Sequence, residues 1–212
     1  YVQFLIYVKN LLRGDLGVSY KLNRSVNDLI GSAFPYTLKL TLLSALLAWL
    51  IGIPAGIVSA IRKNSLIDRL FMGVSLMGVS MPVFWAALLF QYFFAYRMNL
   101  VPVSGATSLS SYFLPSIVLG WSSAGTIARL TRSNLLEVLE EDYIRTAFAK
   151  GRSQSGVILH HAFKNALLPV VTMMAIQVAS MLSGAVITET VFAIPGIGRL
   201  AVDAITSRDM PL

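Results

Sequence analysis

Residues that could do chemistry are few in this chain, and most of them gather in one stretch. The chain holds ten acidic residues, two histidines and no cysteine among 212 residues. Three of the acids are adjacent at residues 140–142, and basic residues follow them closely. His160 and His161 are neighbours, so on a helix they point about 100° apart and cannot readily bind one metal ion. Neither H-E-x-x-H nor G-x-x-x-x-G-K-[ST] occurs. The sequence therefore predicts neither a catalytic triad, nor a metal site, nor a nucleotide site of its own.

A glycine pattern near the end of the chain matches a nucleotide-binding motif. Residues 196–201 (GIGRLA) fit the G-x-G-x-x-A pattern of dinucleotide-binding folds. That fold needs a strand before the pattern and a helix after it. Here Pro195 and a long apolar run come first, so we expect a tight turn.

The acidic group opens a segment, residues 140–151 (EEDYIRTAFAKG), that reads as one short helix. Acids in its first turn, with Lys150 and Arg152 at its end, match the helix macrodipole. Gly151 stands where a left-handed C-cap is expected. Tyr143, Ala147 and Gly151 are spaced by four and share a face. From the residues alone, two interpretations stay open: a solvated loop helix, or a helix that lies in a groove on another protein.

The elements that must position this segment are apolar. Hydrophobic residues make up 56% of the chain and charged residues 13%, with a mean hydropathy of +0.70, whereas soluble domains carry about 25% charged residues. A helix needs about 20 apolar residues to cross a bilayer, and its backbone must be satisfied internally. We therefore expect an all-α polytopic membrane bundle, kinked at Pro54, Pro82 and Pro169, with spans at about 36–61, 71–96, 113–131 and 166–190.

Loop charges predict the orientation of these spans. Six basic residues lie in residues 129–165 and three in residues 62–70, whereas the other connections hold few. By the positive-inside rule, the loop at about 132–165 is cytoplasmic and residues 1–35 are extracytoplasmic. The net charge of +7 is thereby explained without a nucleic-acid partner. Because residue 1 is Tyr, we expect a further segment before it.

Small and polar residues inside the spans allow two interpretations each. Small residues recur every fourth position at Gly52 and Gly56, in residues 120–128, and in residues 175–183, which suits either packing within one bundle or contact with a second subunit. A transport path or gate is one interpretation of the polar residues in the last span, and interhelical hydrogen bonds or headgroup contact is the other. These candidates are Gln177, Ser180, Ser183 and Glu189.

Residues 142–151 (DYIRTAFAKG), followed by 161–169 (HAFKNALLP), resemble the cytoplasmic "EAA" signature of ABC-importer permeases. The form is closest to that of the dipeptide/oligopeptide/nickel permease family. Arg145, where the generic motif is acidic, and the long spacing from Gly151 to Pro169 both resemble the peptide branch. Residues 13–19 (RGDLGVS), 80–85 (SMPVFW), 188–192 (TETVF) and 195–200 (PGIGRL) are similar to further segments of that family, in the same order.

The resemblance implies a type I ABC importer permease in a bacterial inner membrane, with a first span before residue 1 and a sixth after residue 212. Its loop helix, residues 140–151, would be a coupling helix that docks on a cytoplasmic ATPase. The residues carried over to this role are Asp142, Tyr143, Arg145, Thr146, Ala147, Lys150 and Gly151.

The implied partners are a second homologous permease, two ATPase subunits that bind ATP and magnesium, and an extracytoplasmic binding protein. The permease itself would hold no cofactor and catalyse no reaction. The expected solute is a short peptide, with nickel or a metal chelate, or glutathione, as alternatives. A non-transporting scaffold is a further alternative. An ion-driven transporter is another, although it would be expected to show broken helices or paired charges at mid-membrane, which the continuous apolar runs do not predict.

Overall fold

The computed structural model describes residues 2–212, and within them the side chains of all but Val2, Gln3, Ile6, Ser155, Ser183 and Gly184. Across this part of the chain the fold is helical, and the single β pairing is an isolated bridge between Val18 and Ser25. The expected all-α class is confirmed. The helices are α1 (Val2–Leu12), α2 (Val26–Ile61), α3 (Leu66–Ser80), α4 (Val83–Phe90), the π-helix η1 (Gln91–Arg97), α5 (Ser110–Leu139), α6 (Asp142–Ala149), α7 (Gln154–Val157), the π-helix η2 (Ile158–Ala162), α8 (Phe163–Val191) and α9 (Ile197–Ser207).

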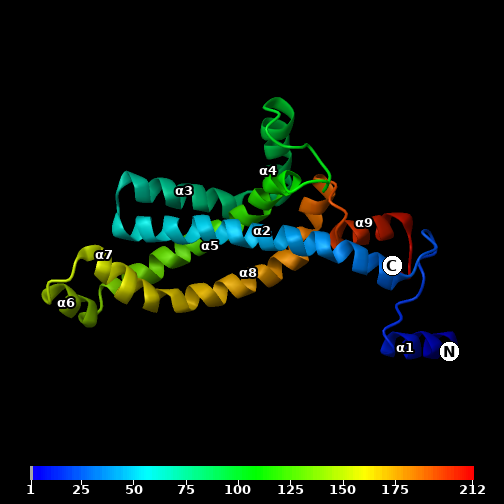
Figure 1. Ribbon diagram of the computed structural model, residues 1–212, viewed down its shortest axis with the longest axis horizontal. Helices are drawn as coiled ribbons and strands as arrows, with labels where there is room; N and C mark the ends of the chain where they lie inside the picture. Colours follow the sequence, from blue (N-terminus) through cyan, green and yellow to red (C-terminus); the bar gives the residue numbers. More distant parts are fainter. Residues whose placement is uncertain (1) are drawn as a thin grey trace.

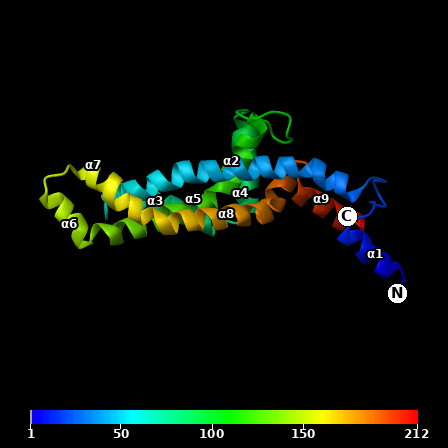
Figure 2. The same ribbon diagram turned by 60° about the horizontal axis from the view of Figure 1, so that its bottom comes forward.

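The molecule is a long bundle with two distinct ends (Figures 1 and 2). Helices α2, α3, α5 and α8 run along its length, and α4 projects sideways from its middle. Helices α6 and α7 form one end, whereas α1, α9 and the chain termini lie at the other. The predicted cytoplasmic loop and the predicted extracytoplasmic segments therefore lie at opposite ends of the bundle.

Helices α2 and α5 pack closely because small residues face each other. A Cβ added to Gly52 or Gly56 on α2 would collide with the carbonyl oxygen of Ala124 or Ala128 on α5. In the same way, a Cβ on Gly120 would meet the carbonyl oxygen of Ser44. These two rows of small residues therefore serve packing within one bundle. In the row on α8, by contrast, Ala175 and Ala179 are exposed.

Among the described residues, two helical stretches are long and apolar enough to cross a membrane, Val26–Ile61 and Ile158–Leu182, and the bent pair of Leu66–Ser80 and Val83–Arg97 adds a third if it is one span. The first begins at Val26, whereas the sequence predicted a span that begins at about residue 36. Pro54 and Pro169 lie inside continuous helices. These are statements of length and composition, and the membrane boundaries stay predictions.

Residues 71–96, predicted as one span with a kink at Pro82, form helices that meet at a sharp bend. Helix α3 ends at Ser80, α4 begins at Val83, and the two are bent by 109°. Pro82 explains the break, because it has no backbone N–H and it forces Met81 into an extended conformation (φ −80°, ψ 129°). The argument from continuous spans against an ion-driven transporter falls with this break.

Candidate functional site

Helix α6 is shorter than the helix that the sequence predicts. It spans Asp142–Ala149, and of the three neighbouring acids only Asp142 lies in its first turn. Glu140 instead ends α5, with its carboxylate 3.8 Å from the ammonium of Lys63, and Glu141 is the N-cap. Gly151 has φ +77°, the left-handed conformation that favours glycine after a helix. The segment is thus a two-turn helix with a sharp stop.

One buried side chain fixes α6 to the bundle. Ile144 is fully buried, against Leu135 of α5 and Val157 and Ile158 of the returning chain. Tyr143 adds a polar link, because its hydroxyl accepts a 2.8 Å hydrogen bond from the side-chain amide of Asn165 on α8. Helix α6 is therefore attached to both α5 and α8, so a displacement of α6 would move both helices. The sequence analysis did not single out Ile144, although it is a lone aliphatic residue between charged ones.

The face that carries Tyr143 and Ala147 is only partly covered, since Tyr143 is 44% exposed. Both residues border a cavity of about 400 Å³ with Thr146, Lys150, Arg152 and His161, and Ala147 also packs on the cluster around Ile144. The outward face carries other side chains. Those of Asp142 and Arg145, 3.4 Å apart, are 96% and 72% exposed, and Phe148 is 41% exposed. An aromatic ring and a loose ion pair thus form the free surface of α6.

Glu189 lies at the opposite end and anchors α9. Its side chain is fully buried, and its carboxylate accepts hydrogen bonds from the Thr37 hydroxyl (2.6 Å) and from the Arg199 backbone N–H (3.0 Å). The Thr37 hydroxyl in turn accepts from the Ile197 N–H at 2.8 Å. A negative charge at the start of a helix is stabilised by the macrodipole. Gly196 is needed here, because a Cβ would collide with the carboxylate.

Residues 197–201 form the start of α9 rather than the tight turn that the sequence predicted, with Gly196 as the N-cap, and α8 rather than a strand precedes them. The other candidates for a path differ in their surroundings. Gln177 accepts a 2.7 Å hydrogen bond from the Ser123 hydroxyl of α5, an interhelical contact. Ser180 is exposed, and the side chain of Ser183 lies outside the described residues. A path or gate role for these residues and for Glu189 stays a prediction.

The sequence analysis missed the clamp that holds the far end of α9. Asp209 is 6% exposed, and its carboxylate accepts from the Ser19 hydroxyl at 2.5 Å and from the backbone N–H groups of Tyr20 (3.1 Å) and Lys21 (3.4 Å). The hydrogen bond from Ser19, followed by those from the two N–H groups, holds the pKa of Asp209 below its ordinary value, although burial raises it. Both ends of α9 are therefore fixed by a carboxylate.

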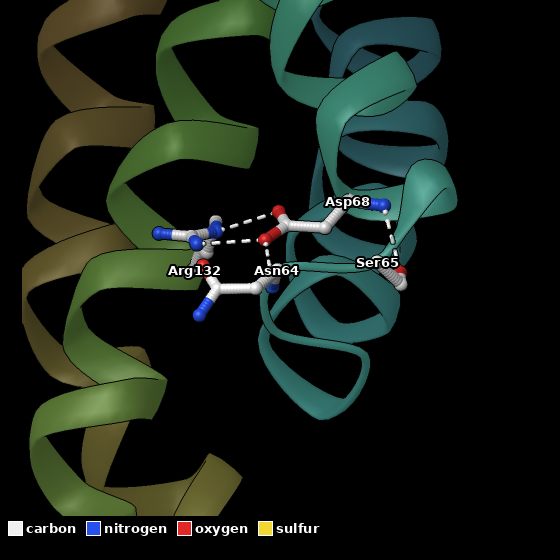
Figure 3. A network of polar contacts seen from close by, with 4 residues as sticks. All are labelled: Asn64, Ser65, Asp68 and Arg132. Carbon is white, nitrogen blue, oxygen red and sulfur yellow. Dashed lines mark hydrogen bonds and ion pairs between the residues drawn. The ribbon is translucent and has the colours of Figure 1, made fainter.

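A second polar network was also missed, at the end of the bundle that carries α6. Arg132 on α5 binds Asp68 on α3 through two parallel hydrogen bonds (Figure 3). The Asn64 N–H donates to the same carboxylate at 2.9 Å, and the Asp68 N–H donates to the Ser65 hydroxyl at 3.2 Å. The α2–α3 turn and α5 are thereby joined. No cluster of three or more potential metal ligands occurs among the side chains that the structure describes.

Comparisons with known proteins agree with this geometry. Residues 52–212 match the family described as "Binding-protein-dependent transport system inner membrane component". A dipeptide transport system permease protein of Alkalihalophilus pseudofirmus is 42% identical, over 100% of this chain and 72% of its own length. A glutathione transport system permease protein of Escherichia coli K12 is 43% identical, over 100% of this chain and 69% of its own.

Solved structures share the fold at low sequence identity. An inward-facing MetNI methionine ABC transporter aligns with a TM-score of 0.68 and 19% identity, over 83% of this chain and 80% of that chain. An amino acid ABC transporter aligns with a TM-score of 0.65 and 18% identity, over 87% and 82%. The expected type I permease fold is confirmed by these matches.

Proposed function

This chain belongs to the binding-protein-dependent transport system inner membrane components, as the permease subunit of an ABC importer, and we propose that the solute it passes is a short peptide. Two relatives support this class, since one is named for dipeptides and the other for glutathione, which is itself a tripeptide. Neither of these two relatives is named for nickel or for a metal chelate.

Coupling to ATP hydrolysis is assigned to the outward face of α6, which would dock on a cytoplasmic ATPase. The observation that carries this assignment is the burial of Ile144 beneath a free surface of Phe148, Arg145 and Asp142. A helix anchored in this way works as a rigid lever, since the interior beneath it is close-packed and transmits strain. The permease would break no bond itself, and the ATPase would hold ATP and magnesium.

The remaining partners are assigned to the two ends and to one side of the bundle. We assign a second permease to the exposed side of α8, where Ala175, Leu168 (74% exposed) and Ile176 (55% exposed) face outward. Two ATPase subunits and an extracytoplasmic binding protein would complete the complex in a bacterial cell membrane. The binding protein would meet the end that carries α9, opposite α6.

Reconstitution tests this function. The permease is purified with its partner permease, ATPases and binding protein, placed in proteoliposomes, and assayed for ATP hydrolysis and for uptake of a labelled dipeptide. We expect the peptide-loaded binding protein to stimulate hydrolysis and the dipeptide to accumulate. Uptake of glutathione without uptake of the dipeptide would contradict the general peptide assignment. A rate of ATP hydrolysis that is the same with and without the loaded binding protein would contradict the coupling.

A further inference from the structure

A cavity of about 610 Å³ opens between α3, α5 and α8, apart from the surfaces assigned above to the partner proteins. It lies on the part of α5 between the interhelical hydrogen bond of Ser123 and the ion pair of Arg132. Its lining includes Met72 and Val79 of α3, Thr126, Arg129 and Ser133 of α5, and Met173 of α8.

The α5 wall of this cavity is polar. Thr126, Arg129 and Ser133 line it at intervals of three and four residues, so they form a polar stripe along one helix face, with Leu130 beside it. The Thr126 hydroxyl donates to the Ser122 carbonyl oxygen at 3.1 Å. The facing walls are soft and apolar, because methionine adapts its shape to what it touches. A ligand that is polar on one side and apolar on the other fits such walls.

The charge in the cavity belongs to Arg129. Arg132 also reaches the lining, but its guanidinium is neutralised by Asp68 at 2.7 Å. Arg129 is exposed, and among the described residues it forms no ion pair with a carboxylate. Arg129 lies one turn before Arg132 on α5, toward the end of the bundle that carries α6. The cavity therefore presents one uncompensated guanidinium beside hydroxyl groups.

We propose that this cavity is a solute site in the permease and that Arg129 binds the carboxylate of the passing solute. A guanidinium forms a planar, bidentate pair with a carboxylate. Met72, Val79 and Met173 then receive an apolar side chain of the same solute. The inference rests on the proposed function and narrows it to short peptides with a free terminal carboxylate.

Direct binding to the permease tests this site without interference from the binding protein. The complex is placed in nanodiscs of zwitterionic lipid, without binding protein, and titrated with a labelled leucine-containing dipeptide as its free acid and as its C-terminal amide. Because a hydrogen bond to a charged group contributes roughly tenfold to a hundredfold in affinity, wild type should bind the acid at least about tenfold more tightly. Arg129→Gln should bind acid and amide equally, and Arg129→Lys should keep part of the preference.

Arg199→Gln is the matched control, since it removes a positive charge from α9, at the far end of the bundle. It should keep the wild-type preference. An unchanged preference in Arg129→Gln, or its absence in wild type, would overturn the inference. An effect of Arg129→Gln that arises only when anionic lipid is added would also overturn it and assign the guanidinium to a headgroup. If binding depends on Arg129 while the loaded binding protein stimulates no hydrolysis, the solute site stands and the importer function fails.

Discussion

Arg132 on α5 holds Asp68 on α3 by two parallel hydrogen bonds, 2.7 Å from Nε and 2.8 Å from Nη2. The Asp68 side chain is 4% exposed and that of Arg132 is 25% exposed. This pair joins α3 and α5 (Figure 3), and it would stiffen the end of the bundle that carries α6 under the proposed coupling role.

Breaking that pair from one side should be costly. Arg132→Met leaves the Asp68 carboxylate buried without its cation, which lowers the free energy of unfolding by about 3 kcal/mol. The double variant Asp68→Leu/Arg132→Met removes both charges and should recover much of this loss. Denaturant unfolding of the detergent-purified permease measures both. Lys63→Met is the control, because the exposed Lys63–Glu140 pair contributes about 0–1 kcal/mol. Equal losses in Arg132→Met and Lys63→Met would refute the account.

Gly196→Ala should loosen α9. The added methyl group collides with the Glu189 carboxylate, so Glu189 must leave Thr37 and the start of α9, at a cost of about 1–3 kcal/mol. Gly31→Ala is the matched control, since nothing lies within 4 Å of a Cβ there and alanine favours the helix. Hydrogen exchange of the α9 amides measures this loosening, and protection should fall in Gly196→Ala but not in Gly31→Ala. Protection that is equal in the two variants would show that Glu189 does not anchor α9.

The Asp209 clamp should weaken in acid. Its pKa is lowered in the folded protein, so the stability it adds is complete above the ordinary value of 3.8 and is lost as pH falls toward the lowered pKa. Exchange rates of the amides of Tyr20 and Lys21, corrected for intrinsic pH dependence, should therefore rise below about pH 4. Asp209→Asn should show high rates at every pH. Asp203→Asn, at an exposed position on α9, should behave as wild type. A wild-type profile in Asp209→Asn would exclude the clamp.

Local patterns in the sequence predicted those features that depend on neighbours along the chain. The spacing of Gly52 and Gly56 marked a close helix contact, and Gly151 marked the stop after α6, because φ above zero favours glycine. Pro82 indicated a kink but not its size, and the two helices are bent by 109°.

Features that join distant segments left no such pattern. Ser19 and Asp209 are separated by 190 residues, and Thr37 and Glu189 by 152. Periodicity placed Tyr143 and Ala147 on one face, but it could not say that both would border a cavity, because the direction of α6 is set by the burial of Ile144.

Cross-linking from α6 tests the central claim most directly, since the chain has no cysteine and one introduced thiol is unique. Phe148→Cys on α6 and Ile205→Cys on α9 (78% exposed) are each labelled with a photoactivatable maleimide on the purified permease, which is then assembled with its partners. We expect Phe148→Cys to yield a covalent adduct with the ATPase, and Ile205→Cys to yield none with it. An ATPase adduct from Ile205→Cys, with none from Phe148→Cys, would contradict the account.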